Sequence, residues 1–290
     1  MHIPVLLKET LEYLNPQKGK NFIDATVGEG GHSFAILEKI RPDGKILGIE
    51  ADPKAKQILE EKIKERGLEN NFILINNNFA HLKKIVQENN FFPIDGVLFD
   101  LGLSSNLIEE SGRGFSFMRQ EILDMRFNPL QQDLTAAQIL SQYSSDELRD
   151  IFKNYGGERF SGRIAKMIIH KRKKEKILFT DQLVKIIKES LGGHYHIKSL
   201  ARVFQSLRIV VNQELENFKT ALHDSLDILN PGGIIVVLSY HSEEDRIVKR
   251  FFKEEKDLTI ITKKPVIPCL NEIKRNRRSR SAKLRAAIKN

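Results

Sequence analysis

The segment from 21 to 33, NFIDATVGEGGHS, joins a short apolar run to a glycine-rich turn and the start of a helix. Glycines at this point let the backbone approach a small ligand, because a side chain would collide with it or require an unfavourable φ. Glu50 ends the next apolar run and follows Gly28 by 22 residues. That is close to the ~20 residues at which an acid accepts the ribose hydroxyls of a bound nucleotide.

The glycine pattern also limits the ligand. A dinucleotide fingerprint needs a third glycine, and Ser33 stands in its place. The turn therefore favours an adenosine ligand without a pyrophosphate, such as S-adenosylmethionine, over the NAD of a dehydrogenase. The alternative is a glycine-rich turn that binds nothing. The chain contains no P-loop and no H-E-x-x-H spacing of metal ligands, so no metal site is expected.

Further polar groups follow the predicted strands near 72–75 and 94–101. Asn78 and Phe79 follow the first of these, and Asp100 lies at the end of the second. Strands and helices alternate up to this point, which predicts an α/β fold with a mainly parallel sheet and helices on both faces. Ligands bind such sheets at the carboxyl ends of the strands, where all these groups should meet. Phe79 would cover a base there, or else belong to the core.

The alternation stops after Ser105. Residues 106–202 have no apolar strand run, and their apolar spacing predicts helices near 136–142, 147–154, 163–174 and 181–191. We therefore expect an inserted helical domain at 106–202, within a discontinuous domain formed by 1–105 and 203–290. One long helix at about 202–229, the turn Asn230-Pro231-Gly232-Gly233 and an apolar strand resume the sheet. This order is typical of S-adenosylmethionine-dependent methyltransferases.

Composition indicates a cytoplasmic protein that does not enter a membrane. The mean hydropathy is −0.34, and no run of ~18 apolar residues occurs. The start, MHIPVLLKE, becomes charged too early for a signal peptide. The single cysteine, Cys269, rules out an internal disulfide.

The net charge of +9 is concentrated at the C-terminus. From Lys274 to Asn290 there are basic residues and no acid, which suits a phosphate backbone, although a solvated tail is the alternative. Alternating apolar residues from Ala282 to Ile288 predict a half-buried edge strand. A second basic cluster lies at 163–174. The candidates for RNA contact in the tail are Arg277, Arg278, Arg280 and Lys283.

Methyl transfer from a sulfonium is an in-line displacement in which positioning supplies most of the catalysis. A weakly nucleophilic exocyclic amine also needs a hydrogen-bond acceptor. The Asp/Asn-Pro-Pro-aromatic loop of many DNA amino-methyltransferases is absent, since Asp100 is followed by LGLSS. Ser104 and His241 are weak candidates for the acceptor, and a helix cap or a core group is the favoured interpretation of His241. The catalytic residue therefore stays open.

With these residues in hand, the chain resembles the RsmH (MraW) family of 16S rRNA cytosine-N4 methyltransferases along nearly its whole length. The motifs that carry the resemblance are HIPVLLKE (2–9), DATVGEGGHS (24–33), DLGLSS (100–105), RGFSFM (113–118), LDMR (123–126), YGGERFSGRIA (155–165), FQSLRIVVNQEL (204–215), PGGIIVVLSYHSEEDRIVKRFF (231–252) and RSRSAKLR (278–285).

The resemblance implies a class I (Rossmann-like) S-adenosylmethionine-dependent methyltransferase whose insert recognises the substrate. The implied reaction methylates N4 of a cytidine in the decoding centre (P site) of 16S rRNA, with the small ribosomal subunit as partner. It also implies that Gly30, Gly31 and His32 contact the cofactor and that Glu50 takes the ribose hydroxyls. Phe79 would lie beside the adenine, and Asp100 would close the pocket near the methionine end.

Three positions depart from the family pattern. Glu50 stands where an aspartate is usual, and Leu107 replaces a glutamine expected to contact the cofactor. Residues 198–201 read KSLA where the family tends to have HPAT. Leu107 and the altered 198–201 segment keep a second hypothesis open, that of a non-catalytic ribosome-assembly protein that binds RNA on the same fold. The oligomeric state stays open between monomer and homodimer.

Overall fold

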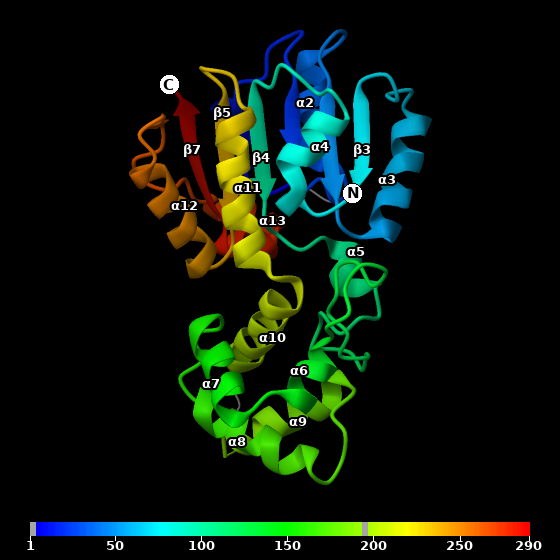
Figure 1. The fold of residues 1–290 in the computed structure, drawn as a ribbon, viewed down its shortest axis with the longest axis vertical. Coiled ribbons are helices and arrows are strands. Elements are labelled where there is room, and N and C mark those ends of the chain that lie inside the picture. Colours follow the sequence, from blue (N-terminus) through cyan, green and yellow to red (C-terminus); the bar gives the residue numbers. More distant parts are fainter. Residues whose placement is uncertain (1–3, 193–196) are drawn as a thin grey trace. The chain divides into compact units, whose positions relative to one another are not determined.

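The computed structural model describes residues 4–192 and 197–290 (Figure 1). His2 and Ile3 of the first family motif therefore lie outside the described residues. The chain divides into two compact units, one formed by Met1–Leu103 and Leu215–Asn290 and the other by Ser104–Glu214. The second boundary thus lies after Glu214, later than the expected boundary after Arg202.

The first unit is built on a seven-stranded sheet in the order β3-β2-β1-β4-β5-β7-β6. Strands β1 to β5 run parallel, whereas β7 is antiparallel to both of its neighbours. This confirms the mainly parallel α/β sheet. The strands are β1 (Phe22–Asp24), β2 (Ile46–Glu50), β3 (Phe72–Asn76), β4 (Gly96–Asp100), β5 (Ile234–Ser239), β6 (Leu258–Ile260) and β7 (Lys283–Lys289).

Strand β7 was predicted to be an edge strand, and this prediction is wrong. It pairs with β5 on one side, where Ala286 faces Val236, and with β6 on the other, where Ile288 faces Thr259. The apolar alternation shows which side chains enter the core, but it does not show how many neighbours pair with the backbone. The last strand therefore holds β6 in the sheet.

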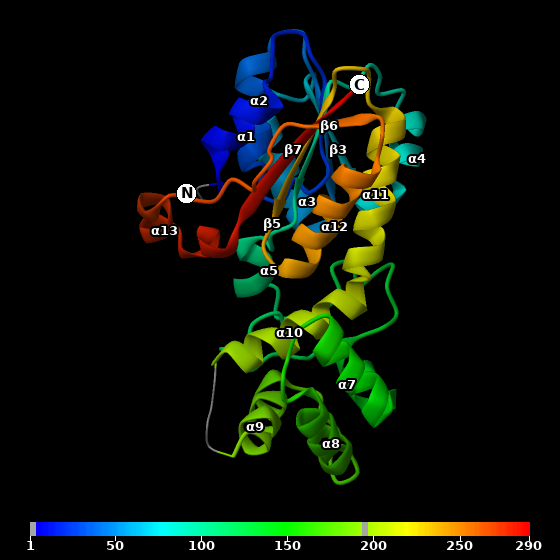
Figure 2. The ribbon, with the colours of Figure 1, turned by 90° about the vertical axis from the view of Figure 1, so that its left-hand side faces the viewer.

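Helices cover both faces of this sheet, as predicted. One core packs α1 (Leu7–Leu14), α2 (Gly31–Ile40) and α3 (Pro53–Glu65) against the sheet. The other face is covered by helices that include α11 (Glu214–Ile228) and α12 (Ser242–Glu254). Figure 2 shows α1 and α2 on one side of the sheet and α11 on the other. The remaining elements of this unit are η1 (Phe79–His81), α4 (Leu82–Glu88), α13 (Leu270–Arg275) and η2 (Arg277–Ser281).

The regular elements of the second unit are helices across its described residues, apart from an isolated β-bridge between Ile122 and Phe179. Capping boxes at Thr135 and Ser144 start two of its helices, because each side chain accepts from a free amide of the first turn. Its core includes Phe152, Ile164 and Leu207, all fully buried. The helices are α5 (Ser105–Glu109), α6 (Ala136–Gln142), α7 (Ser145–Asn154), α8 (Ser161–Arg172), α9 (Thr180–Ser190) and α10 (Ile197–Asn212).

The long helix predicted at about 202–229 is broken in two. Gln213 adopts a left-handed backbone with φ of 50°, which ends α10 before α11 begins. Asn212 is held in place by contacts distant in sequence: its Nδ2 donates to the Met125 carbonyl, and its Oδ1 accepts from the Phe127 amide. Apolar periodicity alone does not show such contacts. Across residues 4–192 and 197–290, no helix is long and apolar enough to cross a membrane.

Candidate functional site

The glycine turn leads from β1 into α2 and needs its glycines for two reasons. Gly28 and Gly30 have φ of 50° and 81°, a conformation that disfavours side chains. A Cβ on Gly30 would also lie 2.7 Å from Leu59 Cδ1, and one on Gly31 would lie 2.5 Å from Pro4 Cγ. The close packing at these two positions is therefore with α3 and the N-terminal segment of the protein itself.

Glu50 ties this turn to the start of α3. Its Oε2 accepts from the Gly28 amide at 3.0 Å, and its Oε1 accepts from the Asp52 amide at 2.9 Å. Burial raises the pKa of Glu50 to about 7, although the two backbone hydrogen bonds oppose the rise. Each oxygen keeps a further lone pair, so the carboxylate can also accept from a ligand hydroxyl.

Asp100, at the end of β4, is held by groups from three other segments. Its amide donates to Thr26 Oγ1 at 2.6 Å, and its Oδ1 accepts from the Tyr240 hydroxyl at 2.7 Å. Its Oδ2 lies 3.4 Å from His32 Nε2. Burial alone would raise the pKa of Asp100, but His32 and the Tyr240 hydroxyl outweigh it and hold this pKa below its usual range. Asp100 is thus an anion at the edge of the sheet, suited to a cationic ligand.

Tyr240 is a site residue that the sequence did not single out. It follows β5 directly, and the only sequence signal for it was its position beside His241 at a strand end. Burial, followed by the Asp100 charge, raises the pKa of Tyr240, so its hydroxyl stays a proton donor at neutral pH. A Cβ on Gly102 would lie 2.9 Å from the Tyr240 ring. The ring therefore lies tightly against the segment that follows Asp100.

His32 and Asp24 form the buried part of the site. His32 is 6% exposed, and its Nδ1 has no hydrogen-bond partner in the part of the chain that the structure describes. Asp24 accepts from Ser33 Oγ at 2.6 Å and from the Thr26 amide at 3.2 Å. Burial raises the pKa of Asp24. The unpartnered imidazole nitrogen leaves His32 able to bond a ligand.

Phe79 begins η1, just after the end of β3. Asn78 caps this turn by accepting from the Ala80 amide at 2.9 Å. The Phe79 ring packs edge-on against Phe99, with centroids 6.1 Å apart, and it is only partly buried. It therefore contributes to the core and also keeps an exposed part at the carboxyl end of the sheet.

Ser104 and His241 are both helix caps. Ser104 Oγ accepts from the Leu107 amide at 3.2 Å at the start of α5. His241 begins α12: its Nδ1 accepts from the Glu244 amide at 3.5 Å, and its Nε2 lies 2.9 Å from Glu244 Oε1. The cap alternative for His241 is therefore what the structure shows.

The basic residues predicted to contact RNA in the tail differ in solvent exposure and in ion pairing. Arg277 and Arg280 are exposed on η2, and Arg278 is half-buried in the same turn. Lys283, the first residue of β7, donates to Asp245 Oδ2 at 2.9 Å. Its charge is thus partly neutralised within the protein.

A parallel sheet with one reversed strand, a glycine turn and strand-end carboxylates define a Rossmann-like methyltransferase. The model of the MraW methylase family matches residues 1–290, and the chain belongs to this family. It is 46% identical over 287 residues to the Ribosomal RNA small subunit methyltransferase H of Dictyoglomus thermophilum, covering 98% of this chain and 95% of the relative.

Two further proteins are similar to this chain. The protein of the same name from Dehalococcoides mccartyi strain BAV1 is 43% identical over 305 residues, covering 99% of this chain and 86% of the relative. Among solved structures, an rRNA methylase from Streptococcus thermophilus is similar with a TM-score of 0.47 and 12% identity, covering 100% of this chain and 99% of that one.

Proposed function

We propose that this protein transfers the methyl group of S-adenosylmethionine to the N4 amine of a cytidine in the decoding centre (P site) of 16S rRNA. Membership of a methylase family and relatives named as small-subunit rRNA methyltransferases support the coarser part, methylation of small-subunit rRNA. The observation that carries the proposal is the linked cluster of His32, Asp100 and Tyr240 at the carboxyl edge of the sheet, with Glu50 bonded to the glycine turn at the same edge.

The residues of this cluster fit S-adenosylmethionine, which supplies an activated methyl group when bound. The Asp100 anion suits the positively charged methionine end of the cofactor, and the Glu50 carboxylate suits the ribose hydroxyls. The unpartnered Nδ1 of His32 is a buried polar atom that a ligand could satisfy. Gly31, the first residue of α2, would add a backbone amide, whereas the Gly30 amide already donates to the Val27 carbonyl at 2.8 Å. Phe79 would flank the adenine.

The protein's contribution to the reaction is then mainly orientation, because the donor is already activated. We assign no side chain as acceptor for the cytosine amine. Ser104 Oγ and His241 Nδ1 each already accept from an amide of the helix that they cap. Either atom would have to give up that hydrogen bond, or share it, in order to serve the substrate.

The test is methyl transfer from labelled S-adenosylmethionine to small subunits purified from a strain that lacks the modification. Nuclease digestion of the RNA should recover the label as N4-methylcytidine. Label on another nucleotide would overturn the proposed target. Cofactor binding without any transfer would instead favour the non-catalytic assembly protein. The D100A variant, tested in parallel, is expected to lose transfer together with cofactor binding.

A further inference from the structure

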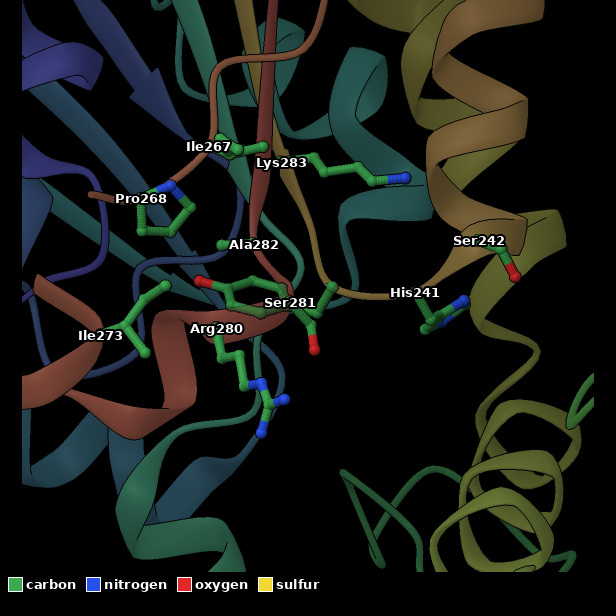
Figure 3. Close-up of a pocket in the computed structure, with 10 residues that line it drawn as sticks. His241, Ser242, Ile267, Pro268, Ile273, Arg280, Ser281, Ala282 and Lys283 are labelled. Carbon is green, nitrogen blue, oxygen red and sulfur yellow. The ribbon is translucent and has the colours of Figure 1, made fainter. Parts of the chain in front are cut away.

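A pocket of about 330 Å³ opens beside the cofactor residues, within the first unit (Figure 3). Two segments distant in sequence contribute most of its polar lining: residues 240–242, after β5, and residues 280–283, between η2 and β7. Ile267, Pro268 and Ile273 form its apolar side. The volume is near the lower end of the ~300–1,000 Å³ range of small-molecule pockets, which suits one nucleotide and not a duplex.

Tyr240 connects this pocket to the proposed cofactor site. The residue lines the pocket, while its hydroxyl donates to Asp100 at 2.7 Å. A ligand in the pocket is therefore separated from the Asp100 carboxylate by one side chain. An enzyme that modifies a base must bring that base out of its stack and against such a surface. Aromatic rings serve this purpose because every base has a face that stacks.

The positive charge of the pocket comes mainly from Arg280. Buried Ser279 fixes the preceding turn, since its Oγ donates to the Asn276 carbonyl at 2.8 Å. This anchor leaves Arg280 and Ser281 exposed at the pocket, where Figure 3 shows both side chains. Across the described residues, the Arg280 guanidinium forms no ion pair, whereas Lys283 is partly neutralised by Asp245, which also pairs with Arg285. Among residues 4–192 and 197–290, no acidic residue lines the pocket.

We propose that this pocket binds the target nucleotide of single-stranded RNA, with Arg280 on a phosphate and the base between Tyr240 and the apolar side. This proposal rests on the proposed function and adds the position of the substrate to it. The combination of an apolar wall, an aromatic ring and an unpaired arginine matches the chemistry of a nucleoside monophosphate. Ile267 is 65% exposed, so this wall is open to a ligand.

The test is calorimetric titration of the full chain, saturated with S-adenosylhomocysteine, with cytidine 5′-monophosphate. We expect saturable binding that R280Q weakens about tenfold, because a charge-assisted bond is lost. The matched control is R250Q, which removes an exposed arginine of α12 outside the pocket. It should leave the affinity unchanged. Absence of saturable binding, or equal effects of the two variants, would overturn the proposal.

Titrations with two further ligands distinguish a nucleotide-binding site from a site that binds only anions. Cytidine and inorganic phosphate should each bind more weakly than the monophosphate, because each keeps only part of the contacts. If phosphate alone binds as tightly, the pocket is an anion site and the proposal fails. Y240F keeps the ring and should retain nucleotide binding, whereas Y240L should lose it. A thermal melt of each variant confirms that it is folded.

These titrations do not depend on methyl transfer, so the two proposals can fail separately. If R280Q abolishes nucleotide binding but the wild type leaves the small subunit unmethylated, the proposed reaction is wrong and the proposed nucleotide pocket stands. A methylated small subunit with an unchanged KM in R280Q would keep the reaction and reject the pocket.

Discussion

Asp100 and Glu50 have pKa values displaced in opposite directions, although both end parallel strands and burial raises both pKa values. The difference lies in their neighbours. Asp100 faces an imidazole and a hydroxyl donor, whereas Glu50 has only backbone amides and lies near the carboxylates of Asp52 and Asp24. Asp100 is therefore an anion at neutral pH, and the pKa of Glu50 lies close to neutral pH.

Replacing Asp100 should weaken cofactor binding. We expect D100A to raise the dissociation constant of S-adenosylmethionine tenfold or more, since a charge-assisted contact worth about 1.5–3 kcal/mol is lost. Calorimetry measures this directly. The control is D95A, because Asp95 precedes the same strand at its other end and binds Lys20 and the Asn21 amide. An unchanged constant in D100A would refute the role of Asp100.

Glu50 should make cofactor affinity depend on pH. Its pKa is about 7 without ligand, and hydroxyl donors from a ribose would lower it, so binding releases a proton below pH 7. Affinity should therefore rise with pH between about 6 and 7.5, by up to tenfold per unit. Calorimetry in buffers of different ionisation enthalpy detects the proton. The E50Q variant should bind the cofactor more weakly and release no proton on binding. If the wild type also releases no proton, the role assigned to Glu50 is wrong.

At the scale of elements, a single carboxylate joins α12 to β7. Asp245 accepts from Arg285 Nε at 2.7 Å and from Lys283 Nζ at 2.9 Å. Burial opposes ionisation, but these two cations outweigh it and lower the pKa of Asp245. Arg285 is only 9% exposed, so its charge depends on this partner.

The D245N variant should lose about 3 kcal/mol of unfolding free energy at pH 7, because a buried arginine is left unpaired. Since the folded pKa of Asp245 is depressed, its contribution is complete above about pH 4 and is lost as the pH falls through the folded value. Denaturant unfolding at pH 7 and in acid measures both effects. The nearby pair of half-buried Glu243 and exposed Arg246 provides the control, and E243Q should cost less than about 1 kcal/mol. Equal losses in both variants would contradict the argument.

At the scale of the whole molecule, the net charge of +9 comes from clusters of basic residues that have different roles. Some of these residues stabilise the fold, and others are exposed. In the α8 cluster, Arg172 donates to the carbonyls of Leu140 and Tyr143, and Lys171 pairs with Glu189. Those charges support the second unit itself. In the tail, Lys283 and Arg285 serve the fold, whereas Arg277 and Arg280 are exposed. Sequence charge therefore overstates the charge available to RNA.

Neutralising the exposed turn should change how RNA binding depends on salt. We expect R277Q/R278Q/R280Q to lower affinity for the small subunit and to reduce the slope of log K against log salt by about one unit per lost phosphate contact. The matched control is K249Q/R250Q/K253Q, which removes the same charge from exposed positions of α12. Filter binding over a range of KCl concentrations measures both. A slope equal to that of the wild type would show that the arginines of η2 do not contact RNA phosphates.

Local chemistry made much of the fold predictable. Asp52 caps α3 by accepting from the Lys54 amide, with Pro53 at the first helical position, as its sequence indicates. The parallel sheet was predictable because its strands are short apolar runs between helices. The break at Gln213 was not, because Asn212 is held by residues more than 80 positions away.

The sequence by itself determined which groups reach the carboxyl edge of the sheet, since chain order and alternation dictate where parallel strands end. It also determined the family, through motifs spread along its length. Only the tertiary structure decided what those groups do there. Asp100 is held as an anion by His32 and by Tyr240, which is 140 residues away and donates to it. Likewise β7 is internal because β6 pairs with its free side. Hydrogen bonds of this kind depend on positions in space, which local spacing does not contain.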